Sequence, residues 1–429
     1  MNDDLERVSR QPGPTDFEWL TGFECTTFPQ IGMDELALTQ HDRFWGSDIV
    51  RAREAGCRVI RYGIRWHVVN PRPRQWDWSS LDGPLELMRH LGMEPIIDVF
   101  HFGTPEWLEG GIMSSVFPDF QAELCREFVR RYPWVRWYTP TNEPYIAAQF
   151  GGEFGHWYPF QHGAENFIVA LRNVARGVCD GWAEIARERP DARMMISDTC
   201  EYHHATDDGQ RSLADFRNER RFLMHELYGG LVGDDHALRP YLLEHGMSET
   251  DLWWFQDHPA PLDVVGLDHY PHSEHELGTG PRGELVDVAR PLELQLGPAE
   301  LSRQYWSRLR RPLIFAETGA PGDDERRSWW LDYLTRAVRE ARGEGVPVIG
   351  ITWWGLIDQV DWASNLRRFD YHIDPTGLYA LEWRGGRLER IPTATLDAWR
   401  RLSGMPVEDS VGPLAGWPAA GDDVPALWS

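Results

Sequence analysis

The chain has 429 residues, of which 43 are basic and 67 acidic, so its formal net charge is −24. Every basic residue is an arginine, which excludes chemistry that needs a lysine Schiff base or the phosphate-gripping lysine of a P-loop. The acidic balance also argues against nonspecific binding to nucleic acid or to an anionic membrane surface.

The composition along the chain predicts one folded domain with two loose ends. Residues 1–15 lack the apolar run of a signal peptide, and residues 404–429, rich in Pro, Gly and Ala, are expected to form an irregular tail. Residues 16–403 are expected to form the catalytic domain, and no apolar run in the sequence is long enough to span a membrane. The five cysteines are widely spread and form no CxxC pair, which is typical of free thiols in the cytoplasm.

Short apolar runs bounded by turn residues predict eight strands. They are expected at 19–25, 58–64, 95–102, 135–141, 193–199, 263–270, 313–318 and 348–354. Apolar residues at helical spacing predict helices at 43–55, 81–91, 120–131, 167–188, 213–228 and 327–341. Strands that alternate with helices in this way indicate a single α/β fold, a (β/α)8 TIM barrel with its active site at the C-terminal ends of the strands.

Two connections of this barrel are unusual. The connection after the fifth strand is long enough for two helices. The segment 274–295 is expected to be an extended loop with little regular structure, which lies over the barrel mouth after the sixth strand.

Two carboxylates stand at predicted strand ends, where a barrel of this kind forms its active site. Glu143 follows the fourth strand in the string TNEP, and Glu317 ends the seventh strand in the string AETG. An isolated glutamate is normally a solvated surface charge, but two at strand ends of one barrel face a common mouth. Glycoside hydrolysis needs such a pair, one protonated and one ionised, with a separation of roughly 5 Å for retention of configuration and more for inversion.

These strings, with four others in the same order, resemble glycoside hydrolase family 1, the retaining β-glycosidases of the large (β/α)8 clan. The resemblance runs from Gly22 to about Leu378. TNEP is similar to the acid/base motif of the family, which implies that Glu143 is the general acid/base. FAETG is similar to the nucleophile motif TENG, which implies that Glu317 is the nucleophile.

The resemblance also implies roles for the residues around this pair. HFGTPEWL resembles the family's HWDLPQWL, so His101 would bind the sugar 3-hydroxyl, and Asn142 of TNEP would contact the 2-hydroxyl. GLDHYP is similar to GINHYT, which implies that Tyr270 holds the nucleophile. Arg61, in VIRYGI, matches an arginine beside the nucleophile and would keep it ionised.

Four further residues are implied to bind the sugar. WWGLIDQVDWA resembles VWSLLDNFEWA, which places Trp354 under the sugar ring and makes Trp362 a second aromatic platform. Asp361 occupies the position of a family glutamate that binds the sugar 4- and 6-hydroxyls. Its side chain is one methylene shorter than that glutamate. Gln30 matches the glutamine that follows the first strand, with one residue inserted.

The sequence departs from the family beside several of these motifs. Phe102 replaces a tryptophan, Gly103 an aspartate, and Thr318 the asparagine after the nucleophile. Together with the shorter Asp361, these changes alter the distal end of the glycone pocket. They therefore bear on the substrate more than on the mechanism.

Two groups of histidines could suggest a metal site. His203 and His204 follow Glu201 after the fifth strand, and His269, His272 and His275 follow the sixth. Carboxylates and imidazoles are zinc ligands. The metal-dependent barrel amidohydrolases open with an HxH motif after their first strand, however, and this chain has ECTTFPQ there. We therefore expect no metal, and assign these histidines to contacts with the leaving group or to the surface.

The function predicted from these observations is a cytoplasmic, cofactor-independent retaining β-glycosidase that hydrolyses small β-glycosides through a covalent glycosyl-enzyme. An acceptor alcohol in place of water would give transglycosylation by the same steps. The expected partner is a small-molecule glycoside, with neither nucleic acid nor membrane, and the oligomeric state stays open. Two alternatives remain: a sugar-binding barrel that has lost its catalysis, and a metal-dependent barrel hydrolase.

Overall fold

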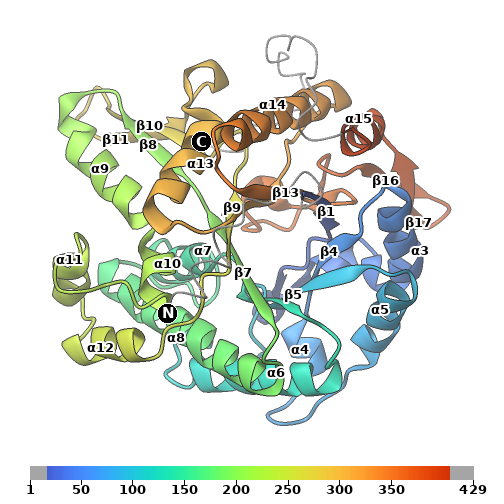
Figure 1. Cartoon of the computed structure of the whole chain (residues 1–429), viewed down its shortest axis with the longest axis horizontal. Helices are drawn as coiled ribbons and strands as arrows, with labels where there is room; N and C mark the ends of the chain where they lie inside the picture. The colour runs from blue at the N-terminus through green and yellow to red at the C-terminus, as the bar shows by residue number, and fades with distance from the viewer. Residues whose placement is uncertain (1–16, 406–429) are drawn as a thin grey trace.

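The computed structural model describes residues 17–405. The segment expected to be loose, 1–15, and the tail 404–429 beyond its first two residues lie outside the described residues. Eight parallel strands close into a barrel, in the order β1, β13, β12, β9, β7, β6, β5, β4 (Figure 1). Their bounds are Glu18–Gly22 (β1), Val59–Gly63 (β4), Glu94–Phe100 (β5), Trp137–Thr141 (β6), Arg193–Thr199 (β7), Val264–Asp268 (β9), Leu313–Thr318 (β12) and Val348–Trp353 (β13). The predicted (β/α)8 barrel is confirmed.

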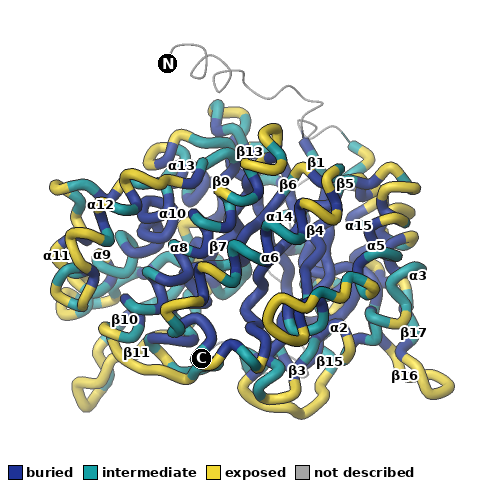
Figure 2. Tube along the Cα trace, turned by 90° about the horizontal axis from the view of Figure 1, so that it is seen from below, coloured by how far each residue is buried: buried dark blue, intermediate teal, exposed yellow. Residues whose placement is uncertain are grey.

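Amphipathic helices surround the barrel and bury the strands inside it, as the buried interior in Figure 2 shows. Helix α8 illustrates the cause, because Phe167, Leu171, Val174 and Val178 recur every three or four residues and are all buried. The long helices are α3 (His41–Glu54), α5 (Ser79–His90), α6 (Phe117–Arg131), α8 (Ala164–Glu188), α13 (Gly297–Leu309), α14 (Asp324–Gly343) and α15 (Ala394–Ser403). None of the described helices combines the length and the apolar character that crossing a membrane requires.

The connection between β7 and β9 is more elaborate than expected. The predicted helix 213–228 is two helices, and two more follow before β9: α9 (Arg211–Arg220), α10 (Leu223–Tyr228), α11 (Arg239–Glu244) and α12 (Glu249–Asp257). The short strand β8 (Tyr202–Ala205) precedes them. One continuous amphipathic pattern thus covers two helices, because consecutive helices can bury the same apolar face.

The expectation of little regular structure at 274–295 is wrong. This segment forms β10 (Glu274–Thr279) and β11 (Leu285–Ala289), an antiparallel hairpin. Strand β10 also pairs in parallel with β8, which gives a three-stranded sheet. The pairing joins segments about 70 residues apart, so the local sequence carried no sign of the partner that satisfies the edge of β10.

Shorter elements complete the chain. They are β2 (Thr27–Phe28), β3 (Met33–Asp34), α2 (Glu35–Leu38), α4 (Trp66–Val69), α7 (Pro144–Ala148), β14 (Gln359–Val360), β15 (Ile373–Asp374), β16 (Tyr379–Arg384) and β17 (Arg387–Pro392). Strands β16 and β17 form a hairpin that the sequence did not reveal.

Apolar side chains fill the barrel interior near the N-terminal ends of its strands. They form one buried cluster: Leu20, Ile96, Met195, Val264, Ile314 and Ala316. Polar and charged side chains gather instead at the C-terminal ends of the strands. The barrel is therefore a packed core at one end and a site for chemistry at the other.

Candidate active site

A cavity of about 420 Å³ opens at the C-terminal ends of the barrel strands. Six of the predicted site residues line it: His101, Glu143, Tyr270, Glu317, Trp354 and Trp362. The other four predicted residues lie behind this lining or beside it, as described below.

Glu143 stands where β6 has ended and α7 begins. Its φ of 38° lies in the left-handed region, which is strained for a residue with a side chain. Its backbone amide donates a hydrogen bond to the carbonyl of Ser197 on β7, over 2.8 Å. Burial raises the pKa of Glu143 well above its usual range, and the carboxylates of Asp268 and Glu317 raise it further. Glu143 is therefore suited to hold a proton at neutral pH.

Glu317 lies on β12 and is 5% exposed. Its Oε1 accepts a hydrogen bond from Nη1 of Arg61 over 2.8 Å, and its Oε2 accepts one from Oη of Tyr270 over 2.9 Å. Burial raises the pKa of Glu317, and the Arg61 guanidinium opposes that rise. Two donors on one carboxylate favour its charged form, so Glu317 is better placed than Glu143 to carry the negative charge.

The two glutamates lie close together, with a third carboxylate beside them. Glu143, Asp268 and Glu317 each offer an oxygen, and these oxygens lie within 4.8 Å of one another. In retaining glycosidases the two carboxyl groups stand about 5–5.5 Å apart, whereas an inverting pair needs roughly 6.5–9.5 Å to admit water. The arrangement therefore has the short spacing that double displacement requires.

Asp268 is a site residue that the sequence reasoning missed. It ends β9, is 1% exposed, and accepts a hydrogen bond at Oδ1 from Oγ of Ser197 over 2.7 Å. Burial raises the pKa of Asp268 well above its usual range, and repulsion from Glu317 adds to the effect. A signal was present, because the family string GINHYT has an asparagine where GLDHYP has Asp268.

Arg61 is fully buried and connects several strands beneath the cavity. Besides Glu317, its guanidinium donates to Oδ2 of Asp98 over 2.8 Å and to Oδ1 of Asn142 over 2.6 Å. Burial alone would lower the pKa of Arg61, but the anionic Asp98 and Glu317 raise it, so the charge is retained. Asn142 is fully buried in this network, and its Nδ2 lies 3.2 Å from Nε2 of His101.

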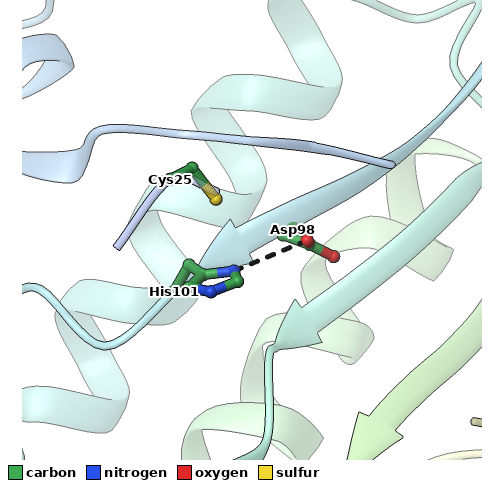
Figure 3. A group of neighbouring side chains, drawn as sticks. All are labelled: Cys25, Asp98 and His101. Atoms are coloured by element: carbon green, nitrogen blue, oxygen red, sulfur yellow. Dashed lines mark ion pairs between the residues drawn. The ribbon is translucent and has the colours of Figure 1, made fainter. Parts of the chain in front are cut away.

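His101 reaches the cavity with its ring held from behind. Figure 3 shows the side chains of Cys25, Asp98 and His101 close to one another, and Nδ1 of His101 lies 3.6 Å from Oδ2 of Asp98. The ring also lies parallel to that of Trp354, with 5.9 Å between the centroids. Burial raises the pKa of the Cys25 thiol well above its usual range. Cys25 is buried in the core cluster, and Asp98 lies beside the imidazole.

Glu24 is a second cavity residue that the sequence reasoning missed. It follows β1, is 4% exposed and lines the cavity. Its Oε2 accepts a hydrogen bond from Nε1 of Trp354 over 2.8 Å, and its Oε1 lies 3.6 Å from Nε2 of His101. A carboxylate at the end of the first predicted strand was the available signal.

Trp354 lies in the floor of the cavity because the backbone beneath it has no side chain. A Cβ added to Gly22, at the end of β1, would lie 2.2 Å from a ring carbon of Trp354. One face of the indole covers the Arg61 guanidinium, whose Cζ is 4.7 Å from the ring centroid. Trp362 also lines the cavity and packs edge-on against Trp157 at 6.1 Å.

The structure does not bring Asp361 and Gln30 into the cavity lining. The carboxylate of Asp361 accepts hydrogen bonds from the backbone amides of Tyr371 and His372, over 3.0 and 2.8 Å. Nε2 of Gln30 donates to the carbonyl of Thr104 over 2.9 Å. Each side chain instead holds a loop together, which their positions in the sequence could not reveal.

Part of the segment 151–160 and part of the two histidine groups lie at the cavity. Phe154, His156 and Trp157 line it, as do His203, His272 and His275. His204 turns away, with Nε2 2.7 Å from Oε2 of Glu274. His269 is fully buried, and its Nδ1 lies 3.5 Å from Sγ of Cys200.

Solved structures of β-glucosidases share this fold. The β-glucosidase of Thermotoga maritima in complex with castanospermine superposes with a TM-score of 0.78 and 17% identity, covering 94% of this chain and all of that one. Its complex with deoxynojirimycin gives a TM-score of 0.77 at 17% identity, with 94% of this chain covered and 100% of the other. The chain has the glycoside hydrolase family 1 β-glucosidase-like fold.

Sequence relatives of this β-glucosidase-like chain are distant. β-Glucosidase A of Thermotoga maritima is 23% identical over 370 residues, which cover 77% of this chain and 80% of the relative. An aryl-phospho-β-D-glucosidase of Bacillus subtilis is 26% identical over 359 residues, 73% of this chain and 75% of the relative. No protein-family model matches the chain. The chain is therefore similar to β-glucosidases in sequence, at low identity.

Proposed function

We propose that the protein is a retaining β-glycosidase that hydrolyses small β-glycosides by double displacement. The observation that carries the proposal is the close approach of Glu143 and Glu317, since one carboxylate oxygen of each lies within 4.8 Å of the other at the barrel mouth. That spacing leaves no room for a water between the carboxylates and the sugar, so one carboxylate attacks the anomeric carbon itself.

In the first step, the ionised Glu317 attacks the anomeric carbon, and the protonated Glu143 donates its proton to the departing oxygen. Arg61 and Tyr270 hold the two Glu317 oxygens in position for this attack. Once Glu317 is esterified to the sugar, its charge no longer raises the pKa of Glu143. Glu143 can then take a proton from water, which attacks the glycosyl-enzyme and releases the sugar with its configuration retained.

The surrounding aromatic and polar groups support a sugar ligand. Trp354 and Trp362 line the cavity, and an indole ring suits the C–H face of a pyranose. Glu24 and His101 line it as hydrogen-bonding groups. The solved relatives of this fold were obtained with sugar-like inhibitors such as castanospermine and deoxynojirimycin. We assign Asn142 and Arg61 to the layer that supports these groups.

Cytoplasmic location is the remaining part of the proposal. All five cysteines, Cys25, Cys57, Cys125, Cys179 and Cys200, are free and buried. Free thiols are characteristic of reducing compartments.

The test is the Glu317→Gly variant with an aryl β-glycoside. Loss of the nucleophile is expected to reduce kcat by roughly 10⁴- to 10⁶-fold. Added azide should occupy the vacated space and restore turnover with an α-glycosyl azide as product, because a single displacement inverts the configuration. The matched variant Glu143→Gly should give a β-glycosyl azide, because azide there attacks the glycosyl-enzyme. Normal hydrolysis by a correctly folded Glu317→Gly variant would overturn the assignment.

The alternative of a sugar-binding barrel without catalysis is not favoured, because both carboxylates are present at the short spacing. Sugar binding in calorimetry with no turnover on a broad panel of β-glycosides would be its signature.

A further inference from the structure

Three groups of side chains in the described part of the chain bring potential metal-ligand atoms within 4.8 Å of one another. They are Cys25, Asp98 and His101; Glu143, Asp268 and Glu317; and Glu201, His203 and His275. In each of the first two groups one carboxylate, Asp98 or Glu317, is already ion-paired with the buried Arg61. That fixed guanidinium repels a second cation. The third group instead combines two imidazoles with one carboxylate.

The three residues of this third group converge because of the β8–β10 pairing. His203 on β8 and His275 on β10 are direct partners in a parallel ladder, so their side chains stand on the same face of the sheet. Glu201 precedes His203 by two residues and shares that face by the alternation of an extended chain. His204 falls on the other face and meets Glu274 there. All three converging residues line the cavity that contains the catalytic carboxylates.

The two histidines are held in place, and each keeps one ring nitrogen that makes no hydrogen bond to the described part of the chain. Nδ1 of His275 lies 2.9 Å from Oδ1 of Asp287, which leaves Nε2 pointing elsewhere, 3.9 Å from Oε1 of Glu201. Asn218 fixes the backbone of His203 on both sides, accepting from its amide and donating to its carbonyl, each over 2.8 Å. The rings of His203 and His275 stack at 4.9 Å.

Two ring nitrogens of this group are buried and make no hydrogen bond among residues 17–405, although a buried polar atom normally needs one. His203 is only 8% exposed, and its Nδ1 makes no hydrogen bond within the described residues. Nε2 of His275 is likewise buried and makes no hydrogen bond there. Because an unpaired buried nitrogen is costly, these atoms indicate a ligand that completes them.

We propose that Glu201, His203 and His275 bind a divalent transition metal, for which Zn²⁺ is the best fit. Two imidazoles and one carboxylate are a ligand set that zinc prefers, and three protein ligands leave one position open. Zinc bonds of about 2.0–2.2 Å place tetrahedral ligands roughly 3.4 Å apart. The partly exposed Glu201 side chain can turn inward to close the present gap. Asp287 then serves as the carboxylate that orients a metal-bound histidine.

The sequence predicted no metal because it does not show that residues 203 and 275 are paired across two strands. Because Glu201, His203 and His275 line the cavity, a ligand in the open position of the ion would lie within it. There the metal would bind an oxygen of the leaving group, such as a carboxylate. This role rests on the proposed glycosidase function, whereas the metal site itself does not.

The experiment is a calorimetric titration of the chelator-treated, dialysed full-length chain with Zn²⁺. Wild type is expected to bind one equivalent per chain. His203→Gln and His275→Gln are expected to weaken that binding by at least 100-fold, and Asp287→Asn by about 10- to 100-fold. The matched control is His258→Gln, at the residue that follows α12, an exposed histidine outside the cavity, and this variant should bind as wild type does. Circular dichroism establishes that each variant is folded.

A spectroscopic measurement covers the case in which one histidine variant does not fold. Co²⁺ in place of Zn²⁺ should give wild type the visible absorption of a low-coordinate site, and Glu201→Gln should change that spectrum. Absence of one-equivalent Zn²⁺ binding to wild type, or unchanged binding in folded His203→Gln or His275→Gln, would overturn the site.

The role in substrate binding has a separate readout. With Zn²⁺ bound, kcat/KM should rise for an aryl β-glycoside that carries a carboxylate on the aryl group, and stay unchanged for the unsubstituted compound. Equal effects on both compounds would refute the role but not the site. Metal binding without any glycosidase activity would refute the proposed function and leave the site standing.

Discussion

Arg61 and Glu317, 256 residues apart in sequence, form a buried ion pair with 2.8 Å between Nη1 and Oε1. The pair joins β4 to β12, strands on different parts of the barrel wall, directly beneath the cavity. Arg61 also holds Asp98 and Asn142, so a single guanidinium positions much of the site.

Removing the Arg61 charge should destabilise the fold strongly. Arg61→Met leaves Asp98 and Glu317 buried without a cation, and we expect the free energy of unfolding to fall by about 3–5 kcal/mol. Urea unfolding followed by circular dichroism measures the change. Arg61→Lys keeps the charge and is the matched control, with a smaller loss. Equal stability of Arg61→Met and wild type would contradict this reading of the network.

The pH profile of kcat/KM should be bell-shaped, with one limb for each glutamate. Activity falls at low pH as Glu317 is protonated and can no longer attack. It falls at high pH as Glu143 loses its proton, and because the pKa of Glu143 is raised well above its usual range, this limb lies on the alkaline side.

The Glu143→Gln variant tests which limb belongs to which residue. With a dinitrophenyl β-glycoside, whose leaving group needs no proton, the alkaline limb should disappear while the acidic limb stays. Pre-steady-state measurement of dinitrophenol release isolates this step. Persistence of the alkaline limb would assign it to another group.

Replacing Asp268 by asparagine should lower the pKa of Glu143, since Asp268 raises it by repulsion. We expect the alkaline limb of kcat/KM to move to lower pH by about one unit. The pKa of Asp268 is itself raised on folding, so its ionisation destabilises the fold as the pH rises through that value. The variant should therefore gain stability relative to wild type at alkaline pH, by about 1 kcal/mol. An unchanged pH profile would mean that Asp268 stays neutral throughout.

Asp361 and Glu24 should behave in opposite ways. Asp361→Ala removes acceptors from the amides of Tyr371 and His372 and should cost about 1–3 kcal/mol of stability, with little change in the preference among glycosides that differ at C4 and C6. Glu24→Ala should instead lower kcat/KM by roughly 10- to 100-fold, because a charged acceptor in the cavity is lost.

A panel of aryl β-glucosides and β-galactosides, with urea unfolding in parallel, separates the two effects. Asp361→Asn and Glu24→Gln are the matched isosteric controls, which keep part of each hydrogen-bond pattern. A change in the ratio of activity on glucosides to activity on galactosides in Asp361→Ala would show that Asp361 acts in the glycone pocket, as its motif suggests.

The barrel and the position of two glutamates at its mouth were predictable from sequence, because both depend on local signals. Short apolar runs bounded by turn residues marked all eight strands, and residues at the C-terminal ends of parallel strands in a closed barrel gather at its mouth. Glu143 and Glu317 could therefore be placed together without coordinates. Periodic apolar faces predicted α3, α5, α6, α8 and α14, and one such pattern covered both α9 and α10. Helices α11, α12, α13 and α15 were not predicted.

Only the tertiary structure decided where the remaining side chains point. The direction of a side chain in a loop depends on which backbone amides lie nearby, and these come from distant segments, as with Asp361 and the amides of residues 371 and 372. In the same way, His203 and His275 become neighbours through a strand pairing across some 70 residues. Strand periodicity specifies what lies at the mouth of the barrel, whereas packing between segments far apart in sequence determines which of those groups reach the cavity.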